Sequence, residues 1–114
     1  KWLVLTPEEW VRQHFLNYLF TERNVSRNLT SVEYGLEYNG RKKRVDILVF
    51  DSQGKPSIMV ECKAPHIPLN EKVVFQIATY NAQFLLPRLC ITNGMQHLWF
   101  DLVDGEYKLQ SFNS

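Results

Sequence analysis

Three charged residues lie within segments of the sequence that otherwise consist of strand-forming apolar residues. Asp46 lies in RVDILVF (44–50), and Glu61 and Lys63 lie in IMVECK (58–63). Side chains at positions i and i+2 of a strand lie on one face, so Glu61 and Lys63 are expected to project to the same side. Burying charged groups is costly unless they are paired or bound to a metal. These three residues are therefore candidates for a site that carries chemistry.

A predicted hairpin brings the two segments together. The sequence DSQGKP (51–56) between them is typical of a turn, so the strands on either side are expected to pair antiparallel. Asp46 and Glu61 lie about equally far from the tip of this turn, near Gln53 and Gly54. We expect the two carboxylates to lie roughly opposite each other across the ladder.

Two carboxylates within reach of one another form a suitable oxygen site for Mg²⁺, which keeps several waters and takes phosphate oxygens as further ligands. A metal bound there lowers the pKa of a water and neutralises charge that grows on a phosphodiester. A nearby lysine can orient the nucleophile or stabilise the transition state. We therefore predict that Asp46 and Glu61 hold Mg²⁺, with Mn²⁺ as a substitute, and that Lys63 positions or activates the water.

The elements that must position these residues follow the order αβββαβ with a terminal hairpin. The segment TPEE (6–9) starts a helix, since Thr6 is a good N-cap and Pro7 suits the first position. Strands are predicted over 32–38 (with one buried face), 43–50 and 57–63, a helix from Asn70 to about Leu86, a buried strand with a parallel neighbour over 89–92, and a last pair over 96–103 and 107–112. This order predicts an α/β (α+β) domain over residues 1–114, with a mixed sheet flanked by helices and a C-terminal β-hairpin.

The chemistry-bearing residues resemble a known nuclease pattern. Asp46, a hairpin and then Glu61-Cys62-Lys63 look like the D…ExK core of the PD-(D/E)xK nuclease superfamily, with Val45 in place of the usual proline. The expected element order matches the restriction-endonuclease-like αβββαβ core of that superfamily. The narrower resemblance is to the N-terminal nuclease domain of type I restriction-enzyme R subunits, and it rests on the segments TPEEWVRQ (6–13), KRVDILV (43–49), VECKAP (60–65), QIATY (76–80) and TNG (92–94).

This resemblance implies an Mg²⁺-dependent endonuclease-type domain that acts on DNA and leaves a 5′-phosphate. Asp46, Glu61 and Lys63 would be its catalytic residues, and the backbone carbonyl of Cys62 would join the two carboxylates at the metal. Expected partners are DNA and other restriction-modification or helicase subunits. The chain has no GxxxxGK[ST] phosphate loop, so it is either part of a larger motor protein or a small free-standing relative.

Gln76 and Tyr80 fit the QxxxY motif of the same group and lie one helical turn apart, so they share a face. Gln76 is expected within a largely buried stripe, where its amide needs partners. The active-site carboxylates or the DNA backbone would serve. The alternative is a helix-surface pair, with the tyrosine packed on the sheet.

An acid from the first helix often joins the site in this superfamily. Helical spacing favours Glu8, which lines up with Val11 and Phe15 on the apolar side, whereas Glu9 points away and is explained as a capping-box residue. Glu8 is explained equally well as a first-turn carboxylate that interacts favourably with the helix dipole.

Composition sets wider bounds. The net charge is only +1, but the run RKKR (41–44) fits either a solvated turn or a phosphate-contacting patch. Cys62 and Cys90 lie in apolar runs and are expected as small core residues, which fits a reducing cytoplasmic setting. No apolar run approaches the length of a membrane span, so no membrane partner is expected.

Two alternatives to a nuclease remain open from the sequence. The first is a nucleic-acid-binding or assembly module on the same fold that does not cut. The second is an interaction domain in which the charged end of the hairpin forms a structural ion-pair cluster.

Overall fold

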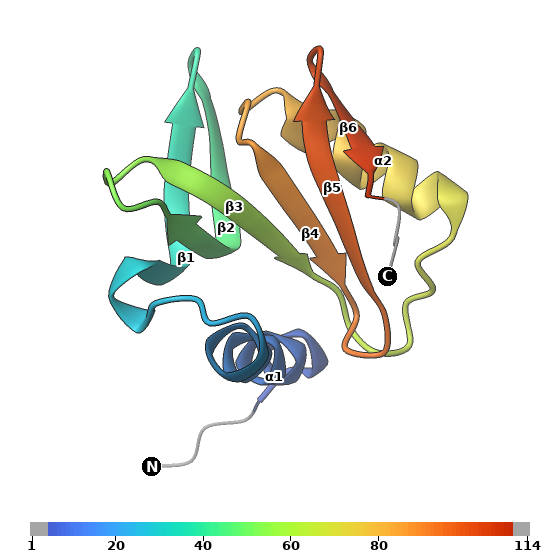
Figure 1. The fold of residues 1–114 in the computed structure, drawn as a ribbon. Coiled ribbons are helices and arrows are strands. Elements are labelled where there is room, and N and C mark those ends of the chain that lie inside the picture. The colour runs from blue at the N-terminus through green and yellow to red at the C-terminus, as the bar shows by residue number, and fades with distance from the viewer. Residues whose placement is uncertain (1–4, 111–114) are drawn as a thin grey trace.

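A computed structural model describes residues 5–110, which form one six-stranded sheet with two α-helices and a short 3-10 helix (Figure 1). The strands follow one another across the sheet in sequence order, and every neighbouring pair is antiparallel except β3 and β4. The elements are α1 (Pro7–Glu22), the 3-10 helix (Arg27–Leu29), β1 (Thr30–Tyr38), β2 (Arg41–Phe50), β3 (Pro56–Cys62), α2 (Glu71–Ala82), β4 (Arg88–Thr92), β5 (His97–Val103) and β6 (Glu106–Leu109). The predicted αβββαβ order with a terminal hairpin is confirmed; residues 111 and 112 of the predicted last strand lie outside the described residues.

Helix α1 begins where its capping signal places it. The side chain of Thr6 accepts a hydrogen bond from the backbone N–H of Glu9 at 3.1 Å. The helix buries a stripe spaced by four residues, which consists of Val11, Phe15 and Leu19. That stripe packs on one face of the sheet, and the helix N-terminus lies beside Asp46 of β2 and the end of β3.

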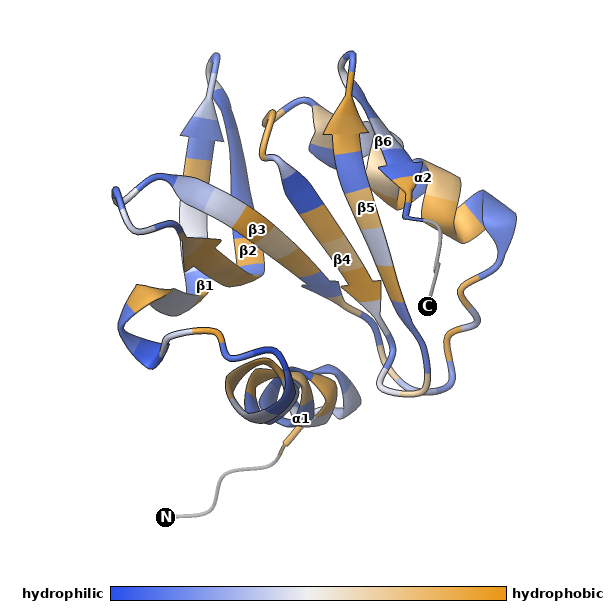
Figure 2. Cartoon of the chain, viewed as in Figure 1, coloured by the Kyte–Doolittle hydropathy of each residue, from blue (hydrophilic) through white to orange (hydrophobic). Residues whose placement is uncertain are grey.

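The two helices cover opposite faces of the sheet. Val60 and Cys62 of β3 pack in the cluster that contains the α1 stripe, whereas Met59 packs in the cluster that α2 covers. This alternation follows from the two-residue period of a strand. Figure 2 shows hydrophobic residues along β3, β4 and β5 and, mixed with hydrophilic ones, on both helices, while the tip of the β1–β2 hairpin is hydrophilic.

The prediction of a buried face on the first strand is wrong. Val32, Tyr34 and Tyr38 are 46%, 37% and 42% exposed. The physical reason is position, because β1 is an edge strand and neither buried cluster contains one of its residues. Leu36 alone is partly buried against the cluster on the α2 side.

Helix α2 is shorter than predicted. Asn70 caps it by accepting the N–H of Val73 at 2.9 Å, but the helix ends at Ala82 and does not reach Pro87. The chain then turns through Leu85, whose φ of 59° lies in the left-handed region. This turn lets Phe84 and Leu86 enter the core.

Two smaller expectations can be compared directly. Cys62 and Cys90 are both free and buried, as predicted for core residues. The basic run at 41–44 forms the start of β2, so it is not a turn.

Between residues 5 and 110, no helix is long and apolar enough to cross a membrane.

Candidate active site

Asp46 lies where the β2–β3 ladder ends. Ile47 pairs with Val60, and one further step of the same register brings Asp46 opposite Glu61. There the backbone pairing stops, and the N–H of Cys62 donates instead to Oδ2 of Asp46 at 2.7 Å. The carboxylate thus takes the place of a backbone acceptor, which fixes its orientation.

The strand alternation of β2 is broken at Asp46. Val45 packs in the cluster on the α2 side and Ile47 in the cluster on the α1 side, although strict alternation would place them on one face. Across the ladder, the β1–β2 register skips the pair of Glu33 and Asp46, and Glu33 has a φ of 50°. This irregularity turns Asp46 towards α1, although the sheet continues on both sides of it.

Asp46, Glu61 and Lys63 lie together on the wall of one polar cleft of about 370 Å³. The cleft is formed by the N-terminus of α1, by β1 and β2, and by the end of β3. Its lining residues are Thr6, Glu8, Glu9, Arg12, Glu33, Asp46, Glu61, Cys62 and Lys63. The structure therefore brings the three sequence-predicted residues to one place.

Burial raises the pKa of Asp46 above its usual range, and the charge of nearby Glu61 adds to this effect. The hydrogen bond from Cys62 N–H and the charges of Lys43 and Arg12 act in the opposite direction without cancelling it. The surrounding groups thus compensate the ionised form of Asp46 only in part. A cation in the cleft would correct that imbalance.

Lys43 is a site residue that sequence reasoning missed. Its Nζ lies 2.8 Å from Oε1 of Glu61, and the two side chains are only 13% and 17% exposed. The ammonium also lies 5.6 Å from the centroid of the Tyr80 ring on α2. Strand parity would place Lys43 on the face opposite Asp46, and the run at 41–44 by itself fits either a solvated turn or a phosphate-contacting patch. The pairing with Glu61 follows from the break in alternation at Asp46.

Arg12 and Glu33 form a second pair that the sequence did not reveal. Arg12 Nη1 lies 2.7 Å from Oε2 of Glu33, and Arg44 Nη1 lies 3.0 Å from the other oxygen. The hydrogen bond and charge of Arg12 lower the pKa of Glu33, with a smaller contribution from Arg44. Arg12 is only 17% exposed and carries positive charge into the cleft beside Asp46.

The end of β3 is held by the turn after β4. The backbone N–H of Lys63 donates to the carbonyl of Thr92 at 2.8 Å, and the side chain of Asn93 donates to the carbonyl of Ile67 at 2.9 Å. Gly94 has a φ of 88°, and a Cβ there would meet Val11 at 3.3 Å. This turn ties the loop that follows Lys63 to the base of the sheet.

Gln76 and Tyr80 lie outside the cleft that Lys63 lines. Neither lines the cleft, and both are exposed, so the prediction that Gln76 lies in a buried stripe is wrong. The reason is that α2 buries Asn81 and rests Val74, Ile77 and Ala78 on the sheet, which leaves Gln76 on the outer side. Tyr80 reaches the site only through Lys43.

Glu8 and Glu9 both line the cleft, so the expectation that Glu9 points away is wrong. Glu9 also fills its predicted capping position, because its N–H is bonded to Thr6. Across residues 5–110, no three His, Cys, Asp or Glu side chains form a group that could hold a metal ion. A metal at Asp46 and Glu61 would therefore need backbone, water or substrate ligands in addition to the two carboxylates, as Mg²⁺ sites commonly do.

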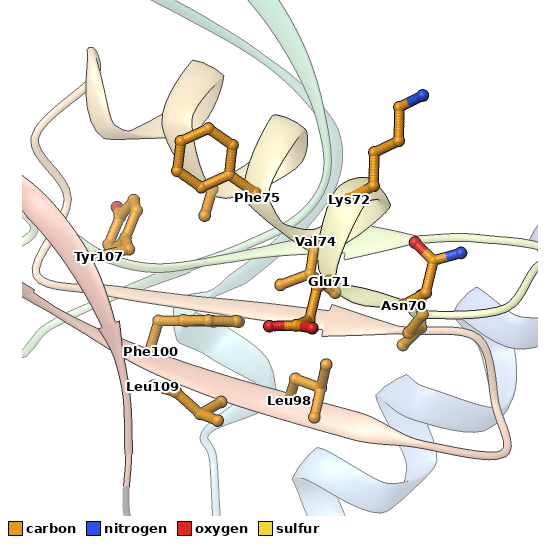
Figure 3. Close-up of a pocket in the computed structure, with 11 residues that line it drawn as sticks. Asn70, Glu71, Lys72, Val74, Phe75, Leu98, Phe100, Tyr107 and Leu109 are labelled. Atoms are coloured by element: carbon orange, nitrogen blue, oxygen red, sulfur yellow. The ribbon is translucent and has the colours of Figure 1, made fainter.

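A larger groove of about 710 Å³ lies elsewhere, between α2 and the strands β5 and β6 (Figure 3). Its floor is apolar, with Leu98, Phe100 and Leu109 from the two strands, and the Lys72 side chain points away from it. It contains no pair of carboxylates. The groups suited to chemistry are in the smaller, polar cleft.

The sheet order, the two flanking helices and the Asp46–Glu61–Lys63 cleft define a protein with an α/β restriction-endonuclease-like fold. The chain belongs to the family described as the type I restriction enzyme R protein N terminus, whose profile matches residues 7–114. No curated protein matches the sequence.

Proposed function

We propose that this chain is a metal-dependent endonuclease-type domain that hydrolyses phosphodiester bonds in DNA. The observation that carries the proposal is the meeting of Asp46, Glu61 and Lys63 on one polar cleft. Family membership supports it, since the matched family is the N-terminal part of a restriction-enzyme subunit. DNA and other restriction-modification or helicase subunits are the proposed partners, and Mg²⁺ is the proposed cofactor, with Mn²⁺ as its substitute.

The residues of the cleft fit a hard divalent cation. Asp46 and Glu61 supply carboxylate oxygens, and Cys62, whose backbone carbonyl we propose as a third donor, lines the same cleft. In the described part of the chain, the hydrogen bond from Cys62 is the only one that Asp46 accepts, which leaves Oδ1 for a ligand. When bound, Mg²⁺ would lower the pKa of a water ligand and neutralise charge on the scissile phosphate.

The other side chains of the cleft have separate roles in this proposal. Lys63 forms no ion pair with any residue from 5 to 110, so its ammonium can orient the attacking water or contact the developing charge. Arg12 is held by Glu33 on the opposite wall and can bind a phosphate oxygen. Exposed Arg41 and Lys42 extend the positive charge along the β1–β2 hairpin, where a DNA backbone would be attracted.

Nicking of supercoiled plasmid DNA with Mg²⁺ or Mn²⁺ tests the proposal. Asp46→Ala and Lys63→Ala are each expected to reduce the rate by about 100-fold or more, the usual scale for loss of a proton-transfer or metal-binding group. Lys108→Ala is a matched control, because this exposed lysine pairs only with Glu106 on β6, away from the cleft. Wild-type nicking that is indistinguishable from both cleft variants would rule out the enzyme.

A DNA-binding or assembly module that does not cut is the second candidate function. The ion pair between Lys43 and Glu61 favours it, because a carboxylate that is already paired is explained without a metal. Measurements of DNA binding and of metal binding together distinguish the two functions. A silent module would bind DNA in a salt-dependent manner and show no heat of binding for Mg²⁺ or Mn²⁺ by calorimetry, with no change on Glu61→Ala.

A further inference from the structure

We propose that Lys43 is a positioning residue that holds Glu61 in the metal-free site and competes with the metal for it. This inference rests on the proposed function, because it assumes that Glu61 is a metal ligand. It gives a specific role to Lys43, which the sequence shows only as part of the basic run at 41–44. It also gives Tyr80 a role, since Tyr80 does not line the cleft itself.

The ion pair has the geometry of a specific contact. Lys43 Nζ and Glu61 Oε1 are 2.8 Å apart, and both side chains are shielded from solvent at 13% and 17% exposure. By comparison, Arg44, the next residue along β2, has a side chain that is 71% exposed and pairs with Glu33 on the other side of the strand. Lys43 therefore belongs to the inner side of the hairpin, where its ammonium has few alternatives to Glu61.

Tyr80 fixes the lysine from the side of α2. The ammonium lies 5.6 Å from the ring centroid, which is within the range of an attractive cation–π contact. The ring is itself held by Phe84, with 5.9 Å between the ring centroids. Since Phe84 is buried in the core, the position of Lys43 is linked to the packing of α2 on the sheet.

The consequence for the cleft is a competition for one carboxylate. Asp46 and Glu61 line the same cleft, so without a cation their charges would repel each other, and the Lys43 ammonium 2.8 Å from Glu61 offsets that repulsion. Oε1 of Glu61 must leave Lys43 before it can bind a metal fully. Any group that favours the lysine-bound arrangement therefore weakens metal binding, and the coupling is reciprocal. Lys43, once released, remains beside the cleft as a cation for a phosphate oxygen.

Calorimetric titration of the protein with Mn²⁺ in the absence of DNA tests this competition. Lys43→Gln is expected to tighten Mn²⁺ binding by about fivefold or more, the lower end of typical coupling between two ligands. Lys42→Gln is the matched control, because it removes the same charge from the exposed neighbouring position. Its effect on the dissociation constant is expected to stay below about twofold, since exposed charges are screened.

A second variant separates the specific contact from general charge removal. Tyr80→Leu leaves the charge unchanged at a position that is 44% exposed, and it is expected to tighten Mn²⁺ binding less than Lys43→Gln does. In the Lys43→Gln background the same change should have no further effect, because its partner is gone. This double-mutant comparison also remains informative if Lys43→Gln lowers the melting temperature.

The outcomes separate the inference from the proposed function. If the wild type binds Mn²⁺ but Lys43→Gln binds it no more tightly, or if Lys42→Gln has an equal effect, the competition is refuted and the nuclease proposal stands. If the wild type binds no Mn²⁺, both are refuted. Tighter binding in Lys43→Gln and Tyr80→Leu, without additivity in the double variant, is the result we expect.

Discussion

Asp46→Asn is expected to stabilise the metal-free protein. The asparagine keeps the shape of the side chain. Its amide oxygen can accept the hydrogen bond that the Cys62 N–H donates to Asp46 at 2.7 Å in the wild type. It removes a charge whose burial raises the pKa of Asp46. The substitution therefore keeps the hydrogen bond of this side chain and removes its buried charge.

The expected magnitude is that of one stabilising substitution, which commonly adds about 0.5–2 kcal/mol to the free energy of unfolding. With a hydrogen bond retained, we expect a gain of about 1 kcal/mol in the free energy of unfolding at neutral pH, within the usual range for relieving an active-site strain. For a domain of this size that gain raises the melting temperature by about 4 °C.

The sign of the pH dependence provides an independent check. Because the folded pKa of Asp46 lies above the ordinary value of 3.8, ionisation costs stability as the pH rises through the folded pKa. Below 3.8 the carboxyl is protonated in both states, so the difference between wild type and variant should disappear there. Asp104→Asn, in an exposed turn, serves as the control and should change stability by less than about 0.5 kcal/mol at any pH.

Urea unfolding in EDTA, repeated across this pH range, is the assay. Addition of Mn²⁺ should reverse the order, since about 100 times the dissociation constant stabilises a binding protein by about 2.7 kcal/mol and leaves a non-binding variant unaffected. An Asp46→Asn variant that is less stable than the wild type in EDTA at neutral pH would refute the reasoning. So would a stability difference that does not vary with pH.

Two further predictions concern the supports of the cleft. Phe15 is 2% exposed at the centre of the α1 stripe, so Phe15→Ala should cost about 3–5 kcal/mol in urea unfolding, and a loss below about 1 kcal/mol would contradict the described packing. Arg12→Gln should raise the pKa of Glu33 towards its ordinary value of 4.5 in an NMR titration. The wild type loses the stabilisation from this pair as the pH falls through the lowered pKa of Glu33, whereas the variant shows only the smaller loss that comes from Arg44. An unchanged pKa of Glu33 would show that the contact at 2.7 Å does not persist in solution.

The proximity of Asp46 and Glu61 could be predicted because it depends only on how many residues separate each of them from the turn between the two strands. The turn at 51–56 sets the hairpin, and the register then places the two residues opposite each other. The parallel pairing of β3 with β4 was also accessible, because continuous apolar runs around a connecting helix are typical of parallel neighbours. Both features depend on the order of residues in short segments.

Lys43 and Arg12 could not be predicted in the same way. Arg12 meets Glu33 because of how α1 packs beside β1. Lys43 meets Glu61 because of a break in alternation at Asp46, for which the segment carries no sequence signal. The left-handed φ of Glu33 is one sign of that break, and glutamate gives no signal for such a conformation.

The wrong burial assignments have a related cause. Alternation in β1 indicated a face but not whether anything covers it, and the edge position leaves Val32 and Tyr34 exposed. Likewise, the apolar residues after Ala82 suggested a longer helix, whereas the core accepts Phe84 and Leu86 only after the turn at Leu85. Which apolar residues are covered is decided by the tertiary packing.

The hydrogen bond from Cys62 to Asp46 makes one backbone amide a reporter for the whole cleft. The Cys62 N–H donates to a side chain, whereas the other amides of the β2–β3 ladder donate to backbone carbonyls. Hydrogen exchange at Cys62 therefore depends on the position of the Asp46 carboxylate as well as on opening of the sheet. If Asp46 rotates towards a ligand, this amide loses its acceptor while Val60, two residues back, stays paired with Ile47. Deuterium exchange at a single position can thus follow the state of the site in a protein that is otherwise fully folded.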